Sequence, residues 1–73
     1  MYDLHEMDER YILQSIEKND VINDYFKKHL LSNIKYRNRL SKKEKDIIIF
    51  SIIFNNDLSD RYRELLINIM KEV

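Results

Sequence analysis

The stretch that decides the fold runs from Ser41 to Phe54 and reads SKKEKDIIIFSIIF. Ser41 followed three residues later by Glu44 is a capping box, in which each side chain accepts a hydrogen bond from the other residue's amide. The apolar residues that follow cover the whole circumference of a helix, so we expect a helix over 41–55 that is buried on most sides. β-Branched isoleucine favours a strand instead, but a single strand in this short chain can pair only with another molecule. The upstream cap therefore predicts a helix.

The chain on either side of this stretch also has helical spacing. Asn55, Asn56 and Asp57 are expected to close the 41–55 helix, because Asn tolerates the left-handed cap conformation. Ser59 and Asp60 then begin a helix over 59–72, with an apolar stripe at three- and four-residue steps. The stripe consists of Tyr62, Leu65, Leu66, Ile69, Met70 and Val73.

The region before Ser41 predicts two more helices, over 4–18 and 20–37, with a break at Asn19 and Asp20. Asp3 and Glu6 have the spacing of a capping box for the first. The second has one apolar face, on which we expect Tyr25 in the core and His29 partly buried against a hydrogen-bond acceptor. The members of that face are Val21, Ile22, Tyr25, Phe26, His29 and Leu30.

Composition limits both the fold and the chemistry. The chain has 73 residues, 44% of them apolar and 36% charged, and it contains no Gly, Pro or Cys. The absence of Cys excludes disulfides, thiolate zinc sites and a cysteine nucleophile, and the absence of Gly excludes the Gly-rich loops that bind nucleotide phosphates. We therefore expect an all-α, compact bundle of three to four helices that forms a single domain over 1–73.

Targeting signals are not expected in this sequence. The longest apolar run, Ile47 to Phe54, is interrupted by Ser51 and is much shorter than the roughly 20 residues that cross a bilayer. Asp3 and Glu6 lie where a signal peptide carries positive charge. We expect a cytoplasmic protein without a membrane partner.

Catalytic patterns are also missing. His5 and His29 are the two histidines, and neither has the neighbours of a catalytic triad. His5 and Glu9 are four residues apart, but two ligands at that spacing recur by chance in an acidic helix. A chain of this size has difficulty enclosing a substrate pocket and keeping a core. We expect no enzyme activity, no cofactor and no metal site.

Charge is segregated along the chain although the net charge is zero. Residues 1–26 carry seven acidic and two basic side chains, residues 27–45 carry eight basic side chains and Glu44, and residues 46–73 carry five acidic and three basic ones. The basic block spans the predicted turn between the second and third helices, where it suits phosphates, an acidic partner or an exposed corner. An aromatic residue within a basic segment is typical of protein hot spots and of single-strand binding sites. We predict partner contacts at Lys35, Tyr36, Arg37, Arg39, Lys42, Lys43 and Lys45.

Two functions remain open from the sequence. The first is a small interaction module that binds a partner protein, as an inhibitor, an antitoxin-like module or a regulatory adaptor does, and that self-associates as a homodimer. The self-association surface is predicted at Leu31, Ile34, Ile48 and Ile52. The alternative is a nucleic-acid-binding transcriptional regulator that uses segment 27–45. With 11 Ile and seven Asn, the composition is typical of an AT-rich gene, and short genes without catalytic signatures are common on phages and other mobile elements.

Overall fold

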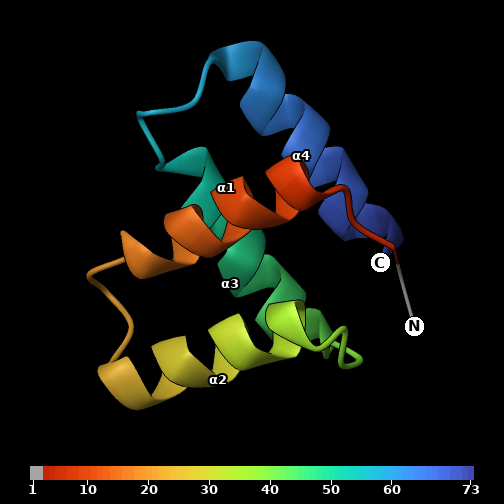
Figure 1. Cartoon of the computed structure of the whole chain (residues 1–73). Helices are drawn as coiled ribbons and strands as arrows, with labels where there is room; N and C mark the ends of the chain where they lie inside the picture. The colour runs from red at the N-terminus through yellow and green to blue at the C-terminus, as the bar shows by residue number, and fades with distance from the viewer. Residues whose placement is uncertain (1–2) are drawn as a thin grey trace.

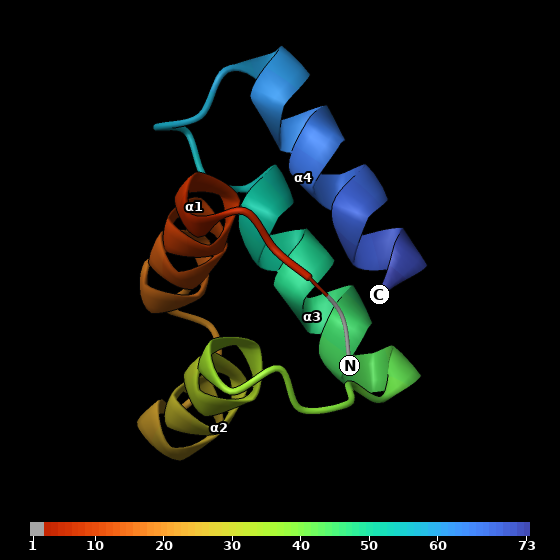
Figure 2. The ribbon, with the colours of Figure 1, turned by 45° about the vertical axis from the view of Figure 1, so that its right-hand side comes forward.

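A computed structural model describes residues 3–73 of the chain, so Met1 and Tyr2 lie outside the described residues. Within them the chain forms four helices, α1 (Glu6–Glu17), α2 (Asp24–Lys35), α3 (Lys42–Ile53) and α4 (Asp60–Glu72). The all-α prediction is confirmed, and each helix falls inside its predicted range. α1 packs against both α2 and α3, and α4 packs on α3. Figures 1 and 2 show two antiparallel pairs, α1 with α2 and α3 with α4, lying across each other.

The two serine caps hold α3 and α4 at their predicted starts. Ser41 Oγ accepts a hydrogen bond from the Glu44 amide at 3.1 Å, and Glu44 Oε1 accepts one from the Ser41 amide at 2.7 Å. Ser59 Oγ accepts from the Tyr62 amide at 3.2 Å. The helix starts nearest the deciding stretch therefore follow from local side-chain chemistry.

α1 and α2 begin later than predicted. The capping box at Asp3 and Glu6 is wrong, because His5 is the N-cap of α1 and its side chain makes no capping hydrogen bond. The break after α1 is confirmed, but the cap of α2 is Asn23, whose Oδ1 accepts from the Phe26 amide at 2.8 Å. Asn19 Oδ1 instead accepts from the Val21 amide at 2.9 Å, which turns the chain locally and delays the next helix.

α2 is followed by a residue in the left-handed backbone conformation. Among residues 3–73, Arg37 alone has a positive φ, at 57°, so the expectation of a left-handed Asn after α3 is wrong. The Arg37 amide donates to the Ile34 carbonyl and the Asn38 amide to the Asn33 carbonyl, which is the Schellman arrangement that usually uses Gly. Without any Gly, the chain uses Arg37, whose Nη1 also donates to the Ile34 carbonyl at 2.5 Å and to Glu9 at 2.6 Å.

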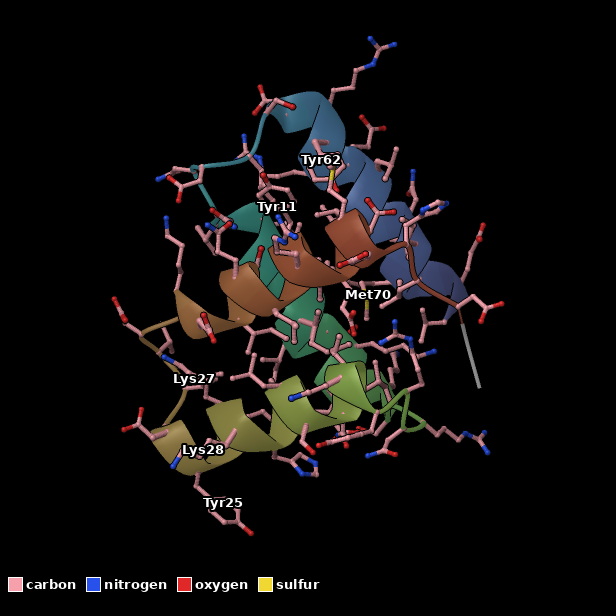
Figure 3. The ribbon with its side chains drawn as sticks, viewed as in Figure 1. Tyr11, Tyr25, Lys27, Lys28, Tyr62 and Met70 are labelled. Atoms are coloured by element: carbon pink, nitrogen blue, oxygen red, sulfur yellow. The ribbon has the colours of Figure 1, made fainter. Side chains whose placement is uncertain are left out.

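The core lies where the two helix pairs cross and differs from the prediction on α2. Tyr25 is 85% exposed and points away from the molecule (Figure 3), and Val21 is 94% exposed. The predicted apolar face is wrong at Val21 and Tyr25, because α2 begins after Val21. Leu30 of that face is buried, and Ile22 and Phe26 pack partly buried against the core. The buried side of α2 also carries Asn33 and Ile34. The buried apolar residues are Ile12, Ile16, Leu30, Ile34, Leu40, Ile48, Ile52, Leu58, Leu66 and Met70.

Three of the four residues predicted for self-association belong to this core. Ile34, Ile48 and Ile52 are fully buried within one chain, so these three side chains form no apolar surface for a second copy. Leu31 is half-buried. α3 itself is buried on one side only, because α1 and α4 cover the side that carries Ile48 and Ile52. Its other side remains in water. Across residues 3–73, no helix has both the length and the apolar character that crossing a bilayer requires.

Candidate functional site

An apolar hollow lies on the uncovered side of α3, against the end of α1 and the loop over 18–23. It has a volume of about 350 Å³. Its walls are mainly apolar, with a few polar groups at the base and the rim, which is the usual composition of a binding pocket. We call it the Phe groove and define it by its lining residues, Ser15, Lys18, Asn19, Asp20, Val21, Ile22, Ile47, Phe50, Ser51 and Phe54.

Two phenylalanines one helical turn apart form the most prominent wall of the Phe groove. The rings of Phe50 and Phe54 stack at 4.8 Å between centroids with an interplanar angle of 19°. Phe50 is 56% exposed and Phe54 is 68% exposed. Single exposed apolar residues are normal on a protein surface, but stacked aromatic rings beside a hollow and an exposed Val21 make a contiguous apolar patch of the kind that marks binding sites.

The base of the Phe groove is held by a hydrogen bond between the loop and α3. Asn19 Nδ2 donates to Ser51 Oγ at 2.8 Å, and Ser51 Oγ donates to the Ile47 carbonyl at 2.9 Å. Because Asn19 also accepts from the Val21 amide, this side chain fixes the loop on α3 and sets the position of Val21 at the rim.

A second polar connection joins α1 to the chain just after α3. Asn55 is 1% exposed. Its Nδ2 donates to Ser15 Oγ at 2.8 Å and to Gln14 Oε1 at 3.4 Å, and its Oδ1 accepts from the Asp57 amide at 3.1 Å. Ser15 Oγ donates in turn to the Tyr11 carbonyl at 2.7 Å. These bonds satisfy the polar groups below the Phe groove and fix α1 against α3.

The rim of the Phe groove is acidic. Lys18 is neutralised by Asp57, with Nζ and Oδ2 2.5 Å apart. Asp20 lines the hollow and has no ion-pair partner within the described part of the chain, and Glu17 and Asp24 stand at the two ends of the same loop without one. Lys27, whose Nζ donates to the Glu17 carbonyl at 2.9 Å, offsets one of these three acidic charges. A ligand segment that carries positive charge beside its apolar side chains suits this rim.

The seven residues predicted for partner binding do not form one surface. Arg37 pairs with Glu9 and supports the end of α2, so its charge is used within the fold. Tyr36 is exposed, and Lys35 Nζ lies 5.8 Å from the centre of its ring. Lys43 is exposed and does not line the Phe groove.

The remaining three predicted residues gather at another hollow, of about 910 Å³, where the loop before α3 meets the end of α4. Arg39, Lys42 and Lys45 line it together with Lys71, which the sequence analysis did not single out because it lies far away along the chain. The other lining residues are Leu40, Ser41, Asp46, Ile49, Glu72 and Val73.

Two titratable groups with shifted pKa values connect the helix pairs. The Ser41 amide, followed by the hydrogen bond from His29, lowers the pKa of Glu44 against the opposing effect of burial. His29 Nε2 lies 2.6 Å from Glu44 Oε2, and Asn33 Nδ2 donates to the same oxygen at 3.1 Å. The predicted acceptor for His29 is thus Glu44, although the histidine is more exposed than expected.

On the other side of the molecule, burial and a hydrogen bond to Asp8 raise the pKa of Tyr62 far above its ordinary value. The Tyr62 ring also meets Tyr11 edge-to-face at 5.6 Å between centroids (Figure 3). Both groups belong to contacts between helices, Glu44 between α2 and α3 and Tyr62 between α1 and α4.

The Phe groove residues were missed because the sequence analysis treated α3 as apolar on all sides. The signal was present in the four-residue spacing of Phe50 and Phe54, on the face opposite Ile48 and Ile52. Over residues 3–73, no group of three or more His, Asp or Glu side chains is placed to hold a metal ion. The chain matches no protein-family model, no curated protein and no solved structure in the comparisons made.

Proposed function

We propose that this chain is a non-enzymatic protein-interaction module that binds a short amphipathic segment of a partner protein in the Phe groove. The observation that carries the proposal is the stacked pair of Phe50 and Phe54, exposed along a hollow of about 350 Å³. Binding hot spots are buried aromatic and aliphatic anchors in such pockets. Occupying a partner's surface in this way is how a small inhibitor, an antitoxin-like module or an adaptor acts.

Charge favours a partner segment with basic residues beside its apolar ones. Lys18 is already paired with Asp57, which leaves Asp20 to face an incoming ligand, with Glu17 and Asp24 at the ends of the loop. A second copy of the chain suits the groove less well. In a two-fold dimer through this surface, each acidic rim meets its own copy, and opposed like charges weaken association.

The test uses two synthetic helical peptides of about 15 residues, a length at which isolated helices begin to form. Both carry the same Leu and Phe face, and the remaining positions are Lys in one peptide and Glu in the other. Fluorescence anisotropy should show that the Lys peptide binds and that Phe50→Ala and Phe54→Ala each weaken its binding by about 30-fold or more, since truncating a hot spot costs about 2 kcal/mol or more. Met7→Ala is the matched control, because Met7 is equally exposed and lies outside the groove.

Three results contradict the proposal. Equal binding of the Lys and Glu peptides would show that the acidic rim does not select a basic segment. Unchanged binding by both Phe variants would show that the peptide binds outside the Phe groove. A solution mass that doubles with concentration, and returns to the monomer mass in Phe54→Ala, assigns the groove to a second copy instead.

A further inference from the structure

The hollow between the loop over 36–41 and the end of α4 gathers unpaired positive charge. Arg39, Lys42, Lys45 and Lys71 all line it, and none of them has an ion-pair partner in the described part of the chain. They come from three separate segments, and Figures 1 and 2 show the loop and the last turn of α4 at the same end of α3. We call this surface the cation groove and define it by these four residues.

The acidic residues near the cation groove neutralise only part of it. Glu44 belongs to the same helix, but its two oxygens accept hydrogen bonds from the Ser41 amide and from His29 and Asn33. Asp46 and Glu72 line the hollow, so four cationic side chains face two carboxylate side chains there. The folded chain therefore keeps a local positive potential although its net charge is zero.

The lining of the cation groove favours a polyanion over a protein segment. Leu40 is buried, Ile49 and Val73 are half-buried, and the lining includes no aromatic side chain. A protein partner gains little apolar burial on such a surface and finds no anchor residue of its usual kind. A phosphodiester chain, in contrast, presents one negative charge per nucleotide and binds through several cations at once.

We infer that the cation groove binds the phosphate backbone of a single-stranded nucleic acid without reading its sequence. A concave surface suits a single strand, whereas duplex DNA is usually read by an element that protrudes into its groove. Tyr36 does not line the hollow, but it lies on the loop that brings Arg39 to it, and its exposed ring has Lys35 above it. Cations beside an exposed aromatic ring are the usual components of a single-strand binding surface.

The test is the salt dependence of binding to a fluorescein-labelled single strand of about 12 nucleotides, within the range of single-strand site sizes. If all four cations contact phosphates, the logarithm of the binding constant should fall with the logarithm of salt concentration with a slope of about −2.8. Affinity then drops by about 50-fold between about 50 mM and about 200 mM salt. In Lys71→Gln or Lys42→Gln, binding at low salt should weaken and the same drop should shrink to about 20-fold.

Lys28→Gln is the matched control. Lys28 is an exposed lysine toward the other end of α2, away from the loop (Figure 3), and should leave affinity and slope unchanged. Helix content measured by circular dichroism verifies that each variant is folded. The inference is overturned if the strand does not bind at about 50 mM salt, or if Lys71→Gln binds as well as the original chain. Loss of affinity in Lys28→Gln to the same degree also overturns it, and tighter binding of a polyglutamate peptide of equal charge assigns the groove to an acidic protein.

Discussion

Replacing Asn55 with alanine is expected to remove about 2–4 kcal/mol from the free energy of unfolding. Asn55 is 1% exposed and connects the end of α3 to α1. Its hydrogen bonds to Ser15 Oγ at 2.8 Å and from the Asp57 amide at 3.1 Å each contribute about 0.5–1.5 kcal/mol. The 3.4 Å contact with Gln14 contributes little at that distance. The space left by the deleted amide adds a cavity penalty of about 1 kcal/mol.

This loss is large for a domain of 73 residues, whose total stability is about 4–11 kcal/mol at the usual value per residue. Urea unfolding monitored by circular dichroism gives the difference directly. Asn56→Ala is the matched control, because Asn56 is the neighbouring residue of the same type and is exposed, so it should change stability by less than about 0.5 kcal/mol. The reasoning fails if Asn55→Ala is as stable as the original chain, or if Asn56→Ala loses as much.

Three further predictions concern the pH dependence, the core and the loop. The Ser41 amide and other partners lower the pKa of Glu44 below its ordinary 4.5. The stability that this carboxylate contributes is therefore present above pH 4.5 and is lost as the pH falls through the lowered pKa. Urea unfolding should show that Glu44→Gln loses less stability on acidification than the original chain does. Ile52→Ala empties a fully buried site and should lower the free energy of unfolding by about 2–5 kcal/mol. Phe54→Ala should lower it by less than about 1.5 kcal/mol, because Phe54 is already about two thirds exposed. Thermal and urea unfolding measure both losses. Asn19→Ala removes the hydrogen bond to Ser51 on α3 and the bond from the Val21 amide within the loop, and should lower stability by about 1–3 kcal/mol. Calorimetric titration should then show weaker binding of the Lys peptide, although Asn19 offers it no apolar contact.

The helix starts near the deciding stretch could be predicted because they depend on side chains within three residues of each other. Ser41 with Glu44 and Ser59 with Tyr62 make their bonds inside one turn. The start of α2 was not predictable in this way, because Asn19 and Asn23 are equally good caps by type. The hydrogen bond from Asn19 to Ser51, far along the chain, favours the later start.

The binding surfaces were less predictable than the helices. The basic side chains of segment 27–45 could be recognised from the sequence. Only the tertiary fold shows that Arg37 forms an ion pair with Glu9 and that Lys71 lines the same groove as Arg39. The exposure of Phe50 depends likewise on which side of α3 the helix α1 covers. Sequence periodicity places apolar residues on a helix, and only packing decides which of them remain in water.

Two-dimensional NMR can map where the Lys peptide binds on the folded chain. If the peptide binds in the Phe groove, saturable shift changes should be concentrated on its apolar walls, at Val21, Ile22, Ile47, Phe50 and Phe54. Changes centred on α4 or on the exposed side of α2, or changes that persist unaltered in Phe54→Ala, would contradict binding in the Phe groove.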